Sequence, residues 1–173
     1  MPGERWRDGG VDEIPLPVTN GRLWLCGKHF VGPDPEGAMA SVGADLVVCL
    51  SEPHEIADRY PSYVDWLQAN APGRALWHPI PDLHAPDAAG ADALLDSLHA
   101  QLAEGRSLLV HCGAGIGRAG TVAAALLVTS GVPLADALTA VRAHRPMAGP
   151  EAGAQTELLE ALDARRVARA TGA

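Results

Sequence analysis

A cysteine and an arginine separated by five small or apolar residues form the most chemically suggestive stretch of this chain. Cys112 and Arg118 enclose "GAGIG" within "VHCGAGIGRAGT". A thiolate is a strong nucleophile, and a planar guanidinium can contact two oxygens of a phosphoryl group at once. Glycines at positions 113, 115 and 117 let successive backbone N–H groups turn inward toward an anion. These residue types predict a loop that combines a nucleophile with an anion cradle.

The elements on either side of this stretch place it where a ligand can bind. The apolar run 107–112 predicts a strand, and 117–130 predicts a helix. Ligands bind at the carboxyl ends of parallel strands, and a helix N-terminus attracts anions. The same field favours the thiolate form of Cys112. The expected phosphate-binding residues are Gly113, Ala114, Gly115, Ile116, Gly117 and Arg118.

Strands and helices alternate along the rest of the chain. Further strands are expected at 45–52 and 74–80, and a hairpin at 15–27 with its turn at Asn20 and Gly21. Helices are expected over 33–44, 61–70, 88–105, 133–145 and 151–170. This order predicts an α/β fold with a central, mostly parallel sheet of four to five strands flanked by helices. We expect one domain over residues 1–173, with 1–15 a flexible or loosely packed N-terminal segment.

The same stretch contains a second pattern, because Gly115, Gly117 and Gly120 spell the G-x-G-x-x-G fingerprint of dinucleotide-binding proteins. That fold needs a second strand ending in an acidic residue about 20 residues later. The nearest acid, Asp136, lies within a helical pattern, and no strand intervenes. A phosphate loop of the Walker type needs a lysine where Thr121 stands. Neither nucleotide-binding interpretation fits the surrounding chain.

Composition narrows the range of partners and cofactors. The net charge of −8 argues against binding to nucleic acid or to an anionic membrane. The three cysteines are far apart and the histidines are scattered, so we expect no disulfide framework, no metal and no cofactor. The first residues lack the apolar run of a secretory signal. A cytoplasmic location is therefore expected.

The motif and its surroundings resemble the protein tyrosine phosphatase superfamily. "VHCGAGIGRAGT" is similar to its phosphate-binding loop, HCxxGxxR followed by Ser or Thr, and the chain length resembles the dual-specificity branch. "VVCLSE", "HPIPD" and "VRAHRP" resemble further family motifs, so the resemblance covers roughly residues 20–160. It implies hydrolysis of phosphomonoesters through a phosphocysteine intermediate. The substrate would be a phosphorylated protein, carrying phosphotyrosine or also phosphoserine and phosphothreonine, or a small phosphomonoester.

The resemblance also implies roles for individual residues. Cys112 would be the nucleophile, and Arg118 would hold the phosphate. Asp82 of "PIPD" would be the general acid, with Asp87 as the reserve candidate. A positioned acid typically contributes about 10²- to 10⁴-fold to such a reaction.

Three further residues are candidates for supporting roles. His111 would orient the loop through a hydrogen bond to its backbone. Glu52 is either a salt-bridge partner of Arg118 or a surface carboxylate. Gln155 either positions the attacking water or lies on the surface of its helix.

One position departs from the family pattern. Residue 119 is alanine where the family has serine or threonine, a hydroxyl thought to stabilise the departing cysteine thiolate. Its loss predicts slow breakdown of the intermediate and leaves open a weakly active phosphate-binding module, a pseudophosphatase. The motif is also compatible with a small-metabolite or phospholipid phosphatase. Sulfur-transfer and arsenate-reducing enzymes use a similar cysteine loop, but the location of this loop in the chain, after an upstream acid, argues against both.

Overall fold

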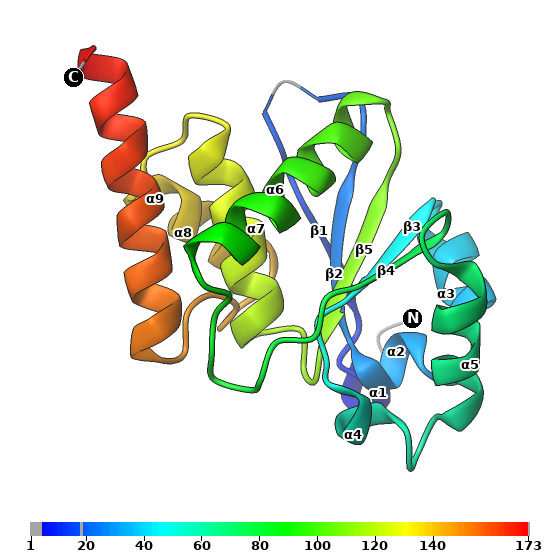
Figure 1. Cartoon of the computed structure of the whole chain (residues 1–173). Coiled ribbons are helices and arrows are strands. Elements are labelled where there is room, and N and C mark those ends of the chain that lie inside the picture. Colours follow the sequence, from blue (N-terminus) through cyan, green and yellow to red (C-terminus); the bar gives the residue numbers. More distant parts are fainter. Residues whose placement is uncertain (1–4, 18, 173) are drawn as a thin grey trace.

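A five-stranded sheet runs through the middle of the computed structural model, which describes residues 5–17 and 19–172 (Figure 1). The strands are β1 (Val11–Ile14), β2 (Leu23–Gly27), β3 (Leu46–Cys49), β4 (Ala75–Trp77) and β5 (Leu108–Cys112). They lie in the order β1-β2-β5-β3-β4; β1 pairs antiparallel with β2, and the remaining pairs are parallel. The predicted α/β fold with a mostly parallel sheet is confirmed.

Helices cover both faces and the carboxyl end of this sheet (Figure 1). They are α1 (Arg5–Asp8), α2 (Lys28–Val31), α3 (Pro35–Val42), α4 (Pro53–Ile56), α5 (Pro61–Asn70), α6 (Ala88–Ala103), α7 (Gly117–Thr129), α8 (Leu134–His144) and α9 (Gly153–Thr171). Helices α6 to α9 lie over one face, and α3 and α5 lie over the other. None of the helices in the described part of the chain combines the length and apolarity needed to cross a bilayer.

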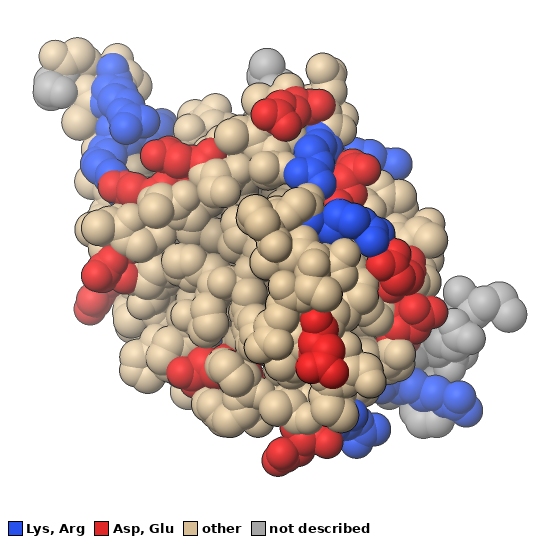
Figure 2. Space-filling model, turned by 45° about the vertical axis from the view of Figure 1, so that its right-hand side comes forward, with Lys and Arg blue, Asp and Glu red and all other residues tan. Residues whose placement is uncertain are grey.

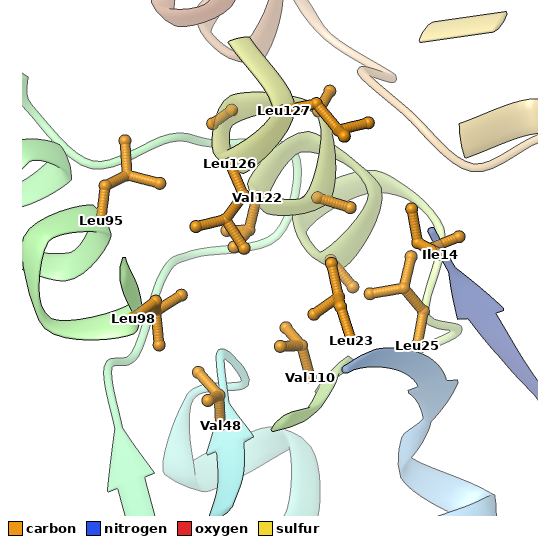
Figure 3. Close-up of a cluster of buried hydrophobic side chains, with 14 of the residues drawn as sticks. Ile14, Leu23, Leu25, Val48, Leu95, Leu98, Val110, Val122, Leu126 and Leu127 are labelled. Atoms are coloured by element: carbon orange, nitrogen blue, oxygen red, sulfur yellow. The ribbon is translucent and has the colours of Figure 1, made fainter. Parts of the chain in front are cut away.

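Alternating residues of the strands pack into two apolar cores, one on each face of the sheet. Val48 and Val110 point toward α6 and α7, where Leu98 and Leu126 meet them (Figure 3). The intervening strand residues pack on the opposite face with Tyr63 and other side chains of α3 and α5. The residues of β3 and β5 are buried without exception, as expected for central strands with helices on both sides. The core therefore fixes the position of the residue that ends β5.

The N-terminal part of the sheet differs from the sequence-based expectation. The strand paired with β2 is Val11–Ile14 rather than the expected segment beginning at residue 15, so the predicted hairpin is wrong. Pro15 and Pro17 have no backbone N–H and cannot donate to a ladder, which explains why the strand ends before them. Residue 18, within that expected hairpin, lies outside the described residues.

The expectation of a loosely packed N-terminal segment does not hold for β1. Ile14 is fully buried, and the four residues Val11–Ile14 pair in register with β2. Residues 1–4 of that expected segment lie outside the described residues. The edge strand therefore belongs to the packed domain, and it carries Asp12 toward the site described below.

Candidate active site

The loop after β5 occupies the middle of the carboxyl end of the sheet. Cys112 is the last residue of β5, with only 3% of its surface exposed, and α7 begins five residues later at Gly117. Gly115 has φ +72°, and a Cβ at that position would lie 2.3 Å from the Cys26 carbonyl oxygen. Only glycine fits there. The sequence-predicted residues 112–118 thus form one tight turn from a strand end into a helix N-terminus.

Arg118 is buried in the first turn of α7, and its guanidinium is held on one side. Nη1 and Nη2 each donate to a carboxylate oxygen of Glu55 at 2.7 Å, and Nη1 also donates to the Ile80 carbonyl at 2.7 Å. Burial alone would raise the pKa of Glu55, but the hydrogen bonds and charge of Arg118 lower it overall. Arg118 Nε is buried and has no hydrogen-bond partner among the described residues. The guanidinium is thus oriented, with one buried N–H able to contact an anion.

The carboxylate that holds Arg118 is Glu55 rather than Glu52. Glu52 precedes α4, and its backbone N–H donates to Glu55 Oε2 at 2.7 Å. Its own carboxylate is partly exposed, with one oxygen 3.7 Å from His54 Nε2. The proposed Glu52–Arg118 salt bridge is therefore wrong. The signal in the sequence was Pro53 followed two residues later by Glu55, a helix start with an acid in its first turn.

Glu55→Gln is expected to lower the free energy of unfolding by about 2 kcal/mol, because a buried guanidinium loses its counter-charge. The matched variant Glu52→Gln keeps its backbone contact and should change stability by less than about 0.5 kcal/mol. Urea denaturation of both variants measures the difference. Equal losses in the two variants would contradict the assignment of Glu55 as the partner of Arg118.

His111 lies fully buried behind the loop and contacts it through the backbone. Its Nδ1 is 3.1 Å from the Cys112 carbonyl oxygen, and its Nε2 is 2.6 Å from the Tyr63 hydroxyl. Burial lowers the pKa of His111 to about 4, so the ring is neutral at pH 7. A neutral ring has one donor; with Nδ1–H donating to the carbonyl, Nε2 accepts from Tyr63. Tyr63, which the sequence did not identify, therefore fixes the ring that touches the loop.

Arg145 holds the loop from its outer side. Its Nε donates to the Gly115 carbonyl at 2.8 Å and its Nη2 to the Ala114 carbonyl at 2.9 Å. In a trans peptide the N–H points opposite to the C=O. Because Arg145 holds the carbonyls of Ala114 and Gly115 on its own side, the N–H group of each of these two peptides points away from Arg145. Arg145 Nη1 also donates to Asp12 Oδ2 at 2.7 Å. Only the "VRAHRP" motif hinted at Arg145, and no local pattern indicated Asp12.

Asp82 lies in the loop that follows β4 and approaches Arg118. Its Oδ1 is 3.4 Å from Arg118 Nη2 and accepts the Leu83 N–H at 3.0 Å, and 70% of its side chain is exposed. Leu83 has φ +64°, a strained value for a leucine. Asp87, by contrast, caps α6 by accepting the Gly90 N–H at 2.7 Å. Of the two candidate acids, only Asp82 lies close to Arg118 and the phosphate-binding loop.

Gln155 is buried in the first turn of α9, with 1% of its surface exposed, so it is not a helix-surface residue. Its Oε1 accepts the Glu151 N–H at 2.7 Å, and its Nε2 donates to the His84 carbonyl at 3.2 Å. The oxygen and the nitrogen of the side-chain amide therefore each form a hydrogen bond with a backbone group. Gln155 thus connects the Asp82 loop to the start of α9.

Comparison with known proteins identifies a family that matches most of this chain. Residues 29–171 match the family described as PTP-SAK, Swiss Army Knife protein, DSP-PTPase phosphatase domain. Dual specificity protein phosphatase 14 of Homo sapiens is 33% identical over 84 residues, which are 47% of this chain and 42% of that protein. The matched region therefore spans less than half of that curated relative.

Two solved structures superpose over most of the chain. Tk-PTP in its active form is 30% identical, with a TM-score of 0.66 over 87% of this chain and 99% of that one. A kinase-associated phosphatase with its catalytic-site cysteine replaced by serine has a TM-score of 0.75 at 24% identity, over 92% and 96% of the two chains, and supports the fold. Because the family match covers most of its length, the chain belongs to the PTP-SAK family of dual-specificity-type phosphatase domains.

Proposed function

We propose that this protein hydrolyses phosphomonoesters through a phosphocysteine intermediate, without a metal or cofactor. The observation that carries the proposal is the convergence around Cys112 of an oriented, buried Arg118 and a loop whose carbonyls are tied outward by Arg145. Phosphotyrosine is the proposed substrate group, with phosphoserine and phosphothreonine as further ones. The three free cysteines suit a reducing compartment, so the proposed location is the cytoplasm.

In the first step the Cys112 sulfur attacks phosphorus on the side opposite the ester oxygen. A P–S bond forms as the P–O ester bond breaks, and Asp82 donates its proton to the departing oxygen. Arg118 and the loop N–H groups hold the three remaining phosphoryl oxygens. Little covalent chemistry is required of them, because positioning and charge stabilisation are the main demands of phosphoryl transfer.

In the second step water attacks the same phosphorus atom from the side that the leaving group vacated. Asp82, now a carboxylate, accepts a proton from this water. The P–S bond breaks, the Cys112 thiolate is restored, and inorganic phosphate is released. The cycle therefore returns every group to its starting protonation state, because Asp82 regains its proton from the water.

Hydrolysis of p-nitrophenyl phosphate in excess EDTA tests the proposal in its simplest form. Turnover should persist in the chelator, and iodoacetate should abolish it by alkylating Cys112, with inorganic phosphate protecting the enzyme. Turnover that requires a divalent cation would overturn the proposed mechanism.

Ala119→Ser is expected to raise steady-state turnover, because a hydroxyl at this position can stabilise the sulfur as it leaves phosphorus. Ala119 is fully buried beside the loop. The nearby Thr121 hydroxyl donates to the Gly117 carbonyl at 2.7 Å, so it is already used within the helix. Stopped-flow assays with p-nitrophenyl phosphate should show a burst in the wild type and a smaller burst in Ala119→Ser. No change in turnover would contradict this account.

Gln155→Leu is expected to impair the general-acid step, because it removes the amide that connects the Asp82 loop to α9. We expect kcat/KM to fall about tenfold for phenyl phosphate, whose leaving group needs a proton, and less for p-nitrophenyl phosphate. Gln68→Leu, on the exposed face of α5, is the matched control. If Gln155 instead positioned water, breakdown of the intermediate would slow equally for both substrates.

A weakly active phosphate-binding module is the second candidate, favoured only by Ala119. It predicts that the chain binds phosphopeptides tightly and turns them over only slowly. Phosphopeptide affinity measured beside steady-state turnover therefore separates the two candidates.

A further inference from the structure

Glu151, in the loop between α8 and α9, places its carboxylate on the first residue of α7. A Cβ on Gly117 would lie 2.9 Å from Glu151 Cδ and closer still to Oε1, so glycine leaves the room that this carboxylate occupies. Gly117 is also part of the phosphate-binding loop and directly precedes Arg118. The carboxylate of Glu151 is therefore in contact with the backbone that would hold a phosphate.

The backbone that carries Glu151 is held against the same loop. The Gly149 N–H donates to the Ile116 carbonyl at 3.0 Å. Gly149 also packs so closely on Gly120 of α7 that a Cβ on Gly120 would overlap the Gly149 nitrogen. These contacts are separate from the hydrogen bond that Gln155 Oε1 accepts from the Glu151 N–H. More than one contact thus fixes the backbone of Glu151 beside the loop.

Exposure alone does not distinguish this carboxylate from others. Acidic side chains are scattered over the face of the molecule shown in Figure 2, in a chain whose net charge is −8. Glu151 differs because it contacts the phosphate-binding loop while its carboxylate forms no hydrogen bond or ion pair within the described part of the chain. Glu55, by contrast, uses both of its oxygens on Arg118. Both oxygens of Glu151 can therefore accept hydrogen bonds from water.

The side-chain amide of Gln155 is not available for the same contact with water. Its oxygen accepts the Glu151 N–H, its nitrogen donates to the His84 carbonyl, and only 1% of the residue is exposed. The same amide links the loop of Glu151 to the loop that carries Asp82, so the two carboxylates come from neighbouring segments. Of Gln155 and Glu151, only Glu151 combines exposure to water with a free acceptor.

We propose that Glu151 orients the water that attacks the phosphocysteine, an inference that rests on the proposed function. This water approaches phosphorus from the side opposite the Cys112 sulfur, where Asp82 accepts one of its protons. Its second O–H bond stays intact and donates a hydrogen bond to a carboxylate oxygen of Glu151, which turns a lone pair of the water toward phosphorus. Holding a reactant in its reactive orientation accelerates a step. Glu151 acts in the second step alone, because the first step involves no water.

Glu151→Ala separates the two steps. The rate constant of the p-nitrophenol burst and kcat/KM both report formation of the phosphocysteine, so each should stay within about twofold of the wild type. The kcat measured after the burst reports breakdown and should fall about tenfold, with KM falling in proportion. Acid quenching and intact mass should show a larger fraction of chains phosphorylated on Cys112. Glu151→Gln keeps an oxygen acceptor at the same place and should recover part of the lost kcat.

Glu157→Ala is the matched control, since Glu157 is exposed on α9. It should keep the wild-type values of both kcat and kcat/KM. Unchanged breakdown of the phosphocysteine in Glu151→Ala, or equal slowing of both steps, would overturn the role of Glu151 and leave the proposed function standing. A wild-type protein that forms no phosphocysteine and shows no turnover would overturn the proposed function and this inference together.

Discussion

Cys112→Ser is expected to lower kcat for p-nitrophenyl phosphate by about 10⁴-fold or more, because a serine hydroxyl is not ionised at neutral pH. The phosphate-binding groups are the loop N–H groups and Arg118, none of which the substitution removes. Affinity for inorganic phosphate should therefore stay within about threefold of the wild type, a difference of less than about 1 kcal/mol. Steady-state assays and calorimetry measure the two quantities.

Cys49→Ser provides the control for this variant. Cys49 lies in β3, and burial raises its pKa to about 12, so it is a neutral thiol in the core. We expect the Cys49 variant to lose some stability while retaining turnover. Turnover by Cys112→Ser comparable to that of the wild type would show that the sulfur of Cys112 is not the nucleophile.

Asp82→Asn is expected to lower kcat/KM for phenyl phosphate by about 10²- to 10³-fold, because the amide cannot donate a proton to the leaving oxygen. The loss should be about tenfold or less for p-nitrophenyl phosphate, whose leaving group is stable as an anion. The neutral amide keeps the shape of the side chain near Arg118, so phosphate affinity should change little. The ratio of the two rate losses is the measurement.

Asp87→Asn serves as the control, since Asp87 lies in the same loop but caps α6. It should keep the wild-type ratio between the two substrates and lose at most about 1 kcal/mol of stability, because asparagine is also a good cap. A leaving-group effect in Asp87→Asn instead of Asp82→Asn would reverse the assignment of the acid.

Local patterns in the sequence were sufficient to predict the central strands and helices of the fold. The strand expected at 107–112 corresponds to β5, and the helix expected at 61–70 is α5 with the same bounds. Gly105 follows α6 with φ +82°, as its place at the end of that helical pattern predicts. The first strand was placed wrongly, because Asn20 and Gly21 form a turn signal but the prolines before them cannot pair. The antiparallel edge depends on contacts with β2, which no local pattern encodes.

In the candidate site, too, the residues of one continuous segment could be predicted from the sequence, and the partners that are distant along the chain could not. Cys112 through Arg118 form one continuous segment, so their spacing alone predicted the loop. Arg118 is bound by a residue 63 positions away, and Arg145 reaches the loop from about 30 positions away. With two acids only three residues apart, the sequence suggested Glu52, while the direction in which α4 turns brings Glu55 to Arg118. Such partners are determined by the packing of elements.

The most direct test of the central claim is to look for the phosphocysteine itself. The wild-type protein is mixed with p-nitrophenyl phosphate, quenched in acid within milliseconds, and analysed by intact mass and by peptide mapping. We expect one added phosphoryl group per chain, located on Cys112, formed in a burst and more abundant in the wild type than in Ala119→Ser. Catalytic turnover with no phosphorylated Cys112, at any quench time, would contradict the phosphocysteine mechanism.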